Sequence, residues 1–153
     1  MTLVALTRLR IRSIRYLPGF YLNSWANARQ LQATPGFLGG LLASEGSRAF
    51  WTFSLWIDEA DMHIFRETDA HARAMPKLME WCDEASVAHY FQDNSKLPSG
   101  AEALSNMVSH GRLSKVRHPS PDHALGRIAS ARREPKPGLQ LRPKVSSAKN
   151  LGT

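Results

Sequence analysis

The chain has 153 residues, of which 42% are hydrophobic and 22% charged, and its formal net charge is +7. This length fits one globular domain with a sizeable core and is short for two. The longest uncharged stretch of the part expected to fold, residues 30–44, contains Pro35 and is shorter than the ~20 residues of a membrane helix, so no membrane-spanning segment is expected. The single cysteine, Cys82, excludes an intramolecular disulfide and favours a reducing, cytoplasmic location.

The positive charge is confined to the C-terminal part of the chain. Residues 1–113 hold 11 basic and 11 acidic residues, whereas residues 114–153 hold 9 basic and 2 acidic ones. The second segment has five prolines and no aromatic residue, so it has little apolar area to offset the entropy lost on ordering. We therefore expect a folded domain over residues 1–113 and a disordered basic tail over residues 114–153. Such a tail would bind polyanions weakly and without sequence preference, because it has no aromatic side chains for stacking.

The first 44 residues contain five arginines and no acidic residue, a bias that transit peptides share. Hydrophobic periodicity favours a folded strand instead. Leu9 and Ile11 alternate with Arg8, Arg10 and Arg12, which is the two-residue repeat of a half-buried strand. We expect a strand over residues 3–12 whose arginines are solvated or paired across the rim of a dimer, or else hold an anionic ligand.

The next segment predicts a helix followed by a hairpin. A helix over residues 20–34 is indicated by apolar positions close to the i, i+4, i+7 spacing, namely Tyr21, Trp25, Ala28 and Leu31. A Pro-Gly pair ends this helix. Two apolar runs, residues 37–44 and 49–57, then flank a turn-forming Glu-Gly-Ser-Arg segment, as in a hairpin of two strands.

Two helices and a strand are expected next. Asp58 can cap a helix over residues 59–67. A second helix is expected over residues 70–85, and Pro76 must either open its regular part or kink it. The apolar stripe of this second helix consists of Met75, Leu78, Met79, Cys82 and Ala85. A strand over residues 86–92 and a short helix over residues 101–109 complete the predicted elements.

The order strand, helix, strand, strand, helix, strand predicts an α+β ferredoxin-like βαββαβ fold, with both helices on one face of an antiparallel sheet. The other face is also apolar, since Trp51 and Phe53 alternate with Phe50 and Trp56 along one strand. An uncovered apolar face of roughly several hundred Å2 would promote aggregation. We therefore expect a homodimer in which two sheets pack face to face as a dimeric α/β barrel.

Several short motifs support this architecture. They are Phe-Trp-Thr-Phe-Ser-Leu-Trp at 50–56, Asp-Glu-Ala at 58–60, Phe65, and Asp-Ala-His-Ala-Arg-Ala-Met at 69–75, preceded by Pro-Gly-Phe at 35–37. In these motifs the chain resembles the dimeric α/β-barrel domains related to antibiotic biosynthesis monooxygenases, over residues 4–91. The resemblance implies the fold. For activity it leaves a choice, because the family includes cofactor-free monooxygenases, haem-degrading members and domains without assigned chemistry.

The haem-degrading branch of that family resembles this chain in topology only. It uses an Asn in the first strand, a Trp in the first part of the second helical region, and a His ten residues further on. Here the first strand has no Asn, Phe65 occupies the aromatic position, and Met75 stands where the His would be. Haem degradation is therefore not expected.

His71 is the candidate catalytic residue, because on the apolar stripe it could act as a base or hydrogen-bond donor in a cavity between helices and sheet. The candidate substrate-binding residues are aromatic and histidine side chains that could line such a cavity: Trp51, Phe65, His89, Tyr90 and Trp25. His89 and Tyr90 point to opposite faces of one strand, so only one of them can face a given cavity. Each of these residues could also be an ordinary packing residue.

Two functions stay open from the sequence. The motifs GxGxxG, GxxxxGK[ST], HExxH and CxxC are absent, and no cofactor or metal is expected. The resemblance implies a cofactor-free monooxygenase, in which a base removes a proton from a planar phenolic substrate and the resulting carbanion reacts with dioxygen. The alternative is a non-catalytic dimeric module that binds a small hydrophobic ligand or only assembles.

Overall fold

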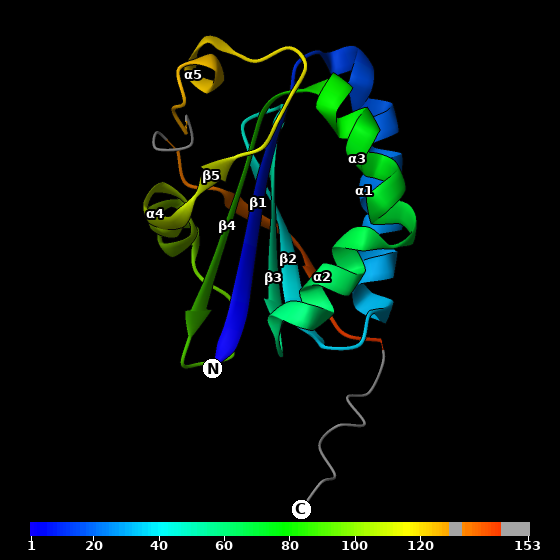
Figure 1. Cartoon of the computed structure of the whole chain (residues 1–153), viewed down its shortest axis with the longest axis vertical. Coiled ribbons are helices and arrows are strands. Elements are labelled where there is room, and N and C mark those ends of the chain that lie inside the picture. The colour runs from blue at the N-terminus through cyan, green and yellow to red at the C-terminus, as the bar shows by residue number, and fades with distance from the viewer. Residues whose placement is uncertain (129–132, 145–153) are drawn as a thin grey trace, which may run out of the picture.

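An antiparallel sheet organises the chain, and the computed structural model describes residues 1–128 and 133–144 of it (Figure 1). Six strands lie in the order β5-β4-β1-β3-β2-β6. Their bounds are β1 Thr2–Ile11, β2 Phe37–Glu45, β3 Ala49–Trp56, β4 Cys82–Gln92, β5 Arg112–Leu113 and β6 Lys136–Leu141. The inner four strands, in the order β4-β1-β3-β2, have the arrangement of a ferredoxin-like domain.

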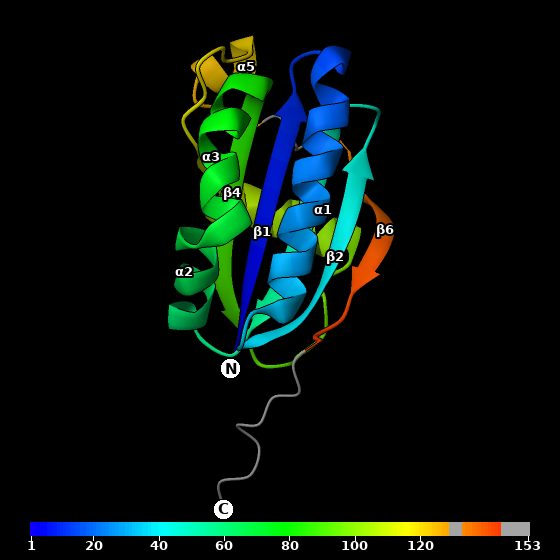
Figure 2. The same ribbon diagram turned by 90° about the vertical axis from the view of Figure 1, so that its right-hand side faces the viewer.

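Helices cover both faces of this sheet. A short 3-10 turn, Ile14–Tyr16, precedes the first helix, and the α-helices are α1 Leu17–Ala33, α2 Glu59–Glu67, α3 Asp69–Trp81, α4 Gly100–His110 and α5 Pro121–Ala124. Figures 1 and 2 show α1, α2 and α3 on one face and α4 on the other. The α+β ferredoxin-like prediction is confirmed. Among the described residues, none of the helices is both long and apolar enough to cross a membrane.

Local sequence explains where most elements begin and end. The side chain of Asp58 accepts a hydrogen bond from the Asp61 N–H and caps α2, as predicted. Ser99 and Glu102 form a capping box that starts α4. The boundary between α3 and β4 was predicted wrongly, since α3 ends at Trp81 and Cys82 already begins β4. The reason is tertiary, because pairing with β1 places Cys82 opposite Ile11.

The inward face of α1 also differs from the prediction. Tyr21 and Trp25 are 54% and 62% exposed, whereas Phe20, Ala28 and Leu31 are buried. The helix is therefore turned so that Phe20 is buried against the sheet, whereas Tyr21 contacts Phe50 edge-on and stays half exposed. Trp25 lies instead under the guanidinium of Arg29, which is 5.2 Å from its ring centre. Cation–π contact of this kind is compatible with an exposed aromatic ring.

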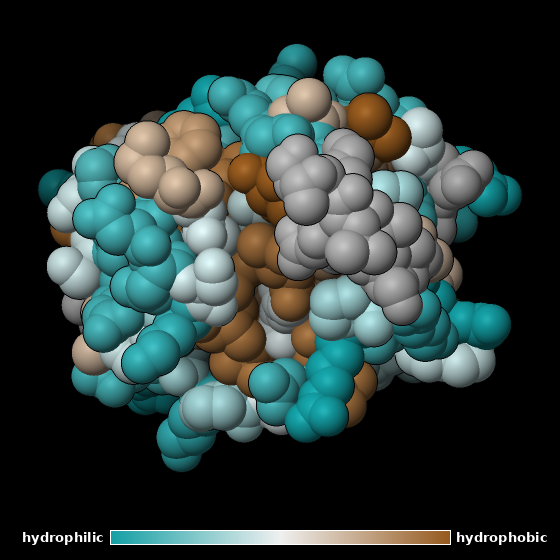
Figure 3. All heavy atoms as spheres, turned by 90° about the horizontal axis from the view of Figure 1, so that it is seen from below, coloured by the Kyte–Doolittle hydropathy of each residue, from teal (hydrophilic) through white to brown (hydrophobic). Residues whose placement is uncertain are grey.

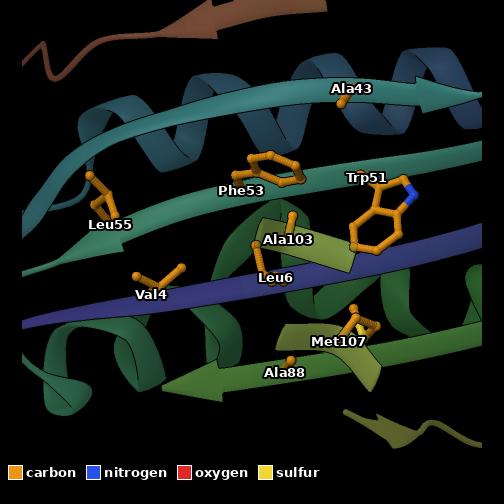
Figure 4. Packing of buried hydrophobic residues seen from close by; sticks show 9 residues of the cluster. All are labelled: Val4, Leu6, Ala43, Trp51, Phe53, Leu55, Ala88, Ala103 and Met107. Atoms are coloured by element: carbon orange, nitrogen blue, oxygen red, sulfur yellow. The ribbon is translucent and has the colours of Figure 1, made fainter. Parts of the chain in front are cut away.

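The second sheet face is covered by the chain itself. Register places Leu6 between Phe53 and Ala88, and all three side chains are almost completely buried. Ala103 and Met107 of α4 pack into the same cluster (Figure 4). This intramolecular cover removes the reason for which a second copy was expected on this face.

Buried ion pairs lie on the same sheet face, near the C-terminal end of β1. Arg8 is 3% exposed, and its guanidinium donates to Glu45 at 2.8 Å and to Glu84 at 3.1 Å. The neighbouring Arg10 donates two hydrogen bonds to Asp83, at 2.9 and 2.7 Å. Burial opposes the charge of Arg8, but the hydrogen bonds and charges of Glu45 and Glu84 outweigh it and raise its pKa. The arginines of β1 are thus paired within the chain.

The segment after Leu113 contributes to the folded structure in its described parts, contrary to the expectation of a wholly disordered tail. β6 pairs with β2 and buries Leu141. Ser120 is buried and donates to Glu84 at 2.8 Å, and Val116 packs near Ile11. Sequence pattern missed these contacts because each depends on one or two side chains that reach a preformed sheet. Residues 129–132 and 145–153 lie outside the described residues.

Whether the folded domain ends at Leu113, as the sequence predicts, or includes β6 can be tested with two leucines of β6. Leu141 is 2% exposed and Leu139 is 60% exposed. We expect Leu141→Ala to lower the free energy of unfolding by about 2–5 kcal/mol, as for other buried leucines. The matched control Leu139→Ala should change it by less than ~0.5 kcal/mol. Chemical denaturation measures both values, and equal effects would show that β6 adds no stability.

Candidate ligand cavity

A cavity of about 590 Å3 lies between the sheet and the helices α1 and α3. Figure 2 shows these two helices side by side above the sheet, with β1 between them. The floor is made by side chains at alternate positions of the strands, such as Ala5, Thr7 and Leu9 of β1. Phe50, Trp56 and other apolar residues complete it. This volume and lining are typical of a site for a small, mostly apolar molecule.

One wall of the cavity carries polar groups from α1. Asn23, Ser24 and Asn27 lie on the inward side of this helix, between the buried Phe20 and Ala28. The Oδ1 atom of Asn27 is buried and has no hydrogen-bond partner in the described part of the chain. A buried acceptor without a partner is costly. Asn27 is therefore suited to accept a hydrogen bond from a molecule in the cavity.

His71 lies at the start of α3 and lines the same cavity. Its Nδ1 is 3.0 Å from the backbone carbonyl of Arg66, and its ring packs on Phe65 with centroids 4.9 Å apart. A carbonyl only accepts hydrogen bonds, so Nδ1 carries the proton and Nε2 keeps its lone pair. Burial, and then the charge of Arg66, lower the pKa of His71 against the opposing effect of the carbonyl. The ring is thus neutral at neutral pH and able to accept a proton.

Gln30 of α1 holds the segment that carries His71. Its Oε1 accepts from the His71 backbone N–H at 3.0 Å, and its Nε2 donates to the carbonyls of Thr68 at 2.8 Å and Phe65 at 3.1 Å. One side chain therefore links α1 to the junction of α2 and α3. This link fixes the start of α3 against the cavity wall.

His89 is a second histidine of the cavity. It lies opposite Ala5 on the cavity face of β4. Burial lowers its pKa, and the charges of Arg112 and Arg66 lower it further. His89 is thus neutral at neutral pH and can donate or accept a hydrogen bond in the cavity.

The structure brings His71, Phe65 and His89 together, but not the other candidate residues. Trp51 lies on the α4 face of the sheet, where its Nε1 donates to Glu45 at 3.2 Å. Tyr90 lies on that face too and stacks on His110 with centroids 5.8 Å apart. Trp25 is exposed on the outer side of α1. Side chains alternate between the two faces of a strand, and the register places Trp51 and Tyr90 on the face opposite to the cavity.

Sequence reasoning missed Asn27 and Gln30. The signal that could have found Asn27 is the run of polar residues on the buried stripe of α1, at positions 23, 24 and 27. An otherwise apolar stripe with polar residues in its middle indicates a solvent- or ligand-filled space rather than close packing. Gln30 has no such signal, because its partners lie 35 to 41 residues away.

Comparison with known proteins supports the fold. No family model matches the sequence, and none of the curated proteins matches it. The structure is similar to a putative antibiotic biosynthesis monooxygenase from Nitrosomonas europaea, with 13% identity, a TM-score of 0.56, and coverage of 62% of this chain and 93% of that one. It is also similar to SnoaB, a cofactor-independent oxygenase from Streptomyces nogalater, with 11% identity, a TM-score of 0.50, and coverage of 61% and 95%.

A protein of unknown function from Nitrosomonas europaea is a third similar structure, with 16% identity, a TM-score of 0.54, and coverage of 64% of this chain and 95% of that one. The structure neighbours are thus antibiotic biosynthesis monooxygenase-like proteins, as the sequence motifs predicted. At these identities the similarity shows a shared fold. Each of these three proteins leaves more than a third of this chain uncovered.

The role of Gln30 can be tested by removing its side chain. We expect Gln30→Ala to lower the free energy of unfolding by roughly 1–2 kcal/mol, because it leaves backbone groups of the α2–α3 junction without partners. The His71 amide should also exchange faster with solvent, since its hydrogen bond to Gln30 is lost. Hydrogen exchange measured by NMR gives both effects. Gln140→Ala on the exposed part of β6 is the control, and an equal effect there would contradict the role of Gln30.

Proposed function

We propose that this protein is a cytoplasmic, cofactor-independent monooxygenase-like oxidoreductase that acts on a small planar hydrophobic or phenolic compound in the cavity. The observation that carries the proposal is His71, a histidine kept neutral by its surroundings, whose Nδ1 is bound to a carbonyl and whose ring lines a largely apolar space. Such a group is suited to general-base catalysis. The similarity of the fold to SnoaB, a cofactor-independent oxygenase, supports the proposal.

The chemistry needs a base, an apolar space and a substrate that supplies the electrons. His71 Nε2 takes a proton from an activated C–H or O–H group of the substrate, and the charge spreads over its ring system. The carbanion then transfers electrons to dioxygen and forms a C–O bond, and the proton returns to give a hydroperoxide. Loss of water leaves a C=O group, so one oxygen atom enters the product and the other leaves as water. The apolar walls favour the delocalised anion and exclude competing water.

The neighbouring groups have supporting roles in this proposal. Asn27 Oδ1 accepts a hydrogen bond from a substrate hydroxyl and orients the ring. His89 is available on the floor of the cavity for a second hydrogen bond. Phe65 and Trp56 provide aromatic surface at one end, with ring centroids 5.7 Å apart. These side chains come from four different elements, so substrate binding depends on the folded domain.

Replacement of His71 is the direct test. We expect His71→Ala to reduce oxygen uptake by about 100-fold or more with a library of phenolic substrates, since a general base typically contributes that much. Uptake is measured with an oxygen electrode, without added flavin or metal. His63→Ala is the matched control, because His63 lies on α2 and pairs with Glu59 outside the cavity lining. Equal activity of the two variants would contradict a catalytic role for His71.

The pH profile gives an independent check. Because burial lowers the pKa of His71, the base form persists below the ordinary histidine value of about 6.5. We expect kcat/KM to stay level as pH falls through that value and to decline only at lower pH. His71 also makes the unfolded chain bind more protons than the folded one as the pH falls below about 6.5. Its contribution to the free energy of unfolding, present above that pH, is therefore lost on acidification. A decline centred at or above the ordinary histidine value would contradict the proposed environment of His71.

A non-catalytic module that binds a small hydrophobic ligand is the alternative function. The observation that favours it is the largely apolar lining of the cavity, which needs no chemistry to hold a ligand. The two functions separate in the assays above. Saturable binding of a phenolic compound without oxygen uptake, together with a His71→Ala variant changed only in stability, would favour the binding module.

We also propose that the protein assembles as a homodimer. Its apolar surface supports this, since Tyr21, Leu22 and Trp25 are exposed on the outer side of α1, and hydrophobic side chains gather in a hollow at the end of the molecule that carries residue 1 (Figure 3). Light scattering at micromolar concentration should report twice the 17.1 kDa chain mass. Trp25→Glu should lower that mass if α1 forms the interface. A monomer at all concentrations would overturn the dimer.

Weak polyanion binding by the basic residues after Leu113 stays a prediction.

A further inference from the structure

Three basic residues line the cavity, and no acidic residue does. They are Arg66, Arg112 and Lys115, and all three are exposed to solvent, which places them at the open side of the cavity. Within the described part of the chain, none of them forms an ion pair. Elsewhere in the molecule, arginines such as Arg8 and Arg10 are bound to carboxylates. The excess of positive charge at the cavity opening is therefore local and uncompensated.

The fold brings these three residues together from separate segments. Arg66 lies in the last turn of α2, next to the helix junction that holds His71. Arg112 lies in β5 opposite Val87, so its side chain shares the cavity face of the sheet with His89. Lys115 lies just beyond β5, after Ser114. Figure 1 shows β5 along the outer edge of β4, beyond the strands of the ferredoxin-like core.

The electrostatics of His89 agree with this arrangement. The charges of Arg112 and Arg66 are the largest contributions after burial to the lowered pKa of His89, so both act at the same point of the cavity. The carboxylate whose charge opposes this effect is Glu59, which is within hydrogen-bond distance of His63 at 3.3 Å. An anionic group near His89 would thus meet two guanidinium groups and little opposing negative charge.

We propose that the ligand of this cavity is a planar hydrophobic compound with an anionic group, such as an aromatic hydroxy acid, whose anionic group is bound by Arg66, Arg112 and Lys115. The proposal rests on the proposed function and narrows its substrate class. Guanidinium groups bind carboxylates through paired hydrogen bonds, which fixes orientation as well as position. With the anionic group at the open side, the apolar rings lie in the interior of the cavity, beside His71 and Asn27.

Two isosteric probes test this inference without requiring catalysis. Hydroxynaphthoate and its analogue hydroxynaphthamide have nearly the same shape, but only the first carries a negative charge. We expect the full-length protein to bind the carboxylate at least about 10-fold more tightly, as measured by isothermal titration calorimetry at low ionic strength. The preference should shrink to about 3-fold or less in about 0.5 M NaCl, because salt screens charges at the surface.

Variants then assign the preference to the three residues. The preference for the carboxylate probe should fall about 2- to 5-fold in each of the single variants Arg66→Gln, Arg112→Gln and Lys115→Gln. The triple variant should abolish this preference while binding of the amide probe stays unchanged. Lys136→Gln, an exposed cation on the opposite sheet edge, is the charge-matched control and should have no effect. Circular dichroism melting verifies that the variants are folded. Their side chains are exposed and form no ion pairs in the described chain, so melting temperatures should not move.

The outcomes separate this inference from the proposed function. Equal binding of the two probes, a preference that survives in the triple variant, or no binding of either probe would overturn the anionic ligand class. Absence of oxygen uptake, with the charge preference intact, would overturn the monooxygenase activity and leave the ligand class standing. Oxygen uptake that is equal for neutral and anionic phenols would overturn the anionic ligand class and leave the monooxygenase activity standing.

Discussion

A β-sheet that is apolar on both faces must be covered on both faces. In this protein β3 places Trp51, Phe53 and Leu55 on one side and Phe50 and Trp56 on the other. Leaving either side in water would expose an aggregation-prone surface. The chain meets this constraint by itself, since α1, α2 and α3 cover one face and α4 covers the other. The positions of the remaining segments follow from this division.

The two covers differ in how closely they pack, and this difference creates the candidate site. On the α4 face, Ala103 and Met107 fill the space above the sheet, and buried ion pairs of Arg8 extend the contact. On the other face, α1 presents Asn23, Ser24 and Asn27 between its apolar contacts. These polar side chains cannot replace the apolar packing of a core. A cavity therefore remains between α1, α3 and the sheet, and its volume is available to a ligand.

This chain is longer than the part of it that matches the antibiotic biosynthesis monooxygenase-like proteins of similar fold. Those proteins are covered over nearly their whole length, yet they account for less than two thirds of this chain. In this chain the residues after β4 supply α4 for one sheet face, and Arg112 and Lys115 for the opening of the cavity. A fold shared at low identity does not define a substrate. What the cavity can bind depends on the groups that line it in this chain.

The sequence by itself determined the element order and the ferredoxin-like fold, because period-two and helical patterns report which face of an element is buried. It offered His71, Phe65 and His89 as candidates for one cavity, but it left open whether His89 or Tyr90 faces that cavity. It did not determine the roles of α4 and β6 in covering and extending the sheet, or the loss of Trp51 and Tyr90 from the cavity. Those depend on register and on contacts between residues far apart in the chain, such as Leu141 with β2. Tertiary structure alone decided that Asn27 and Gln30 belong to the site, since a polar residue on a helix becomes a site residue only when packing leaves a space beside it or brings a distant partner to it.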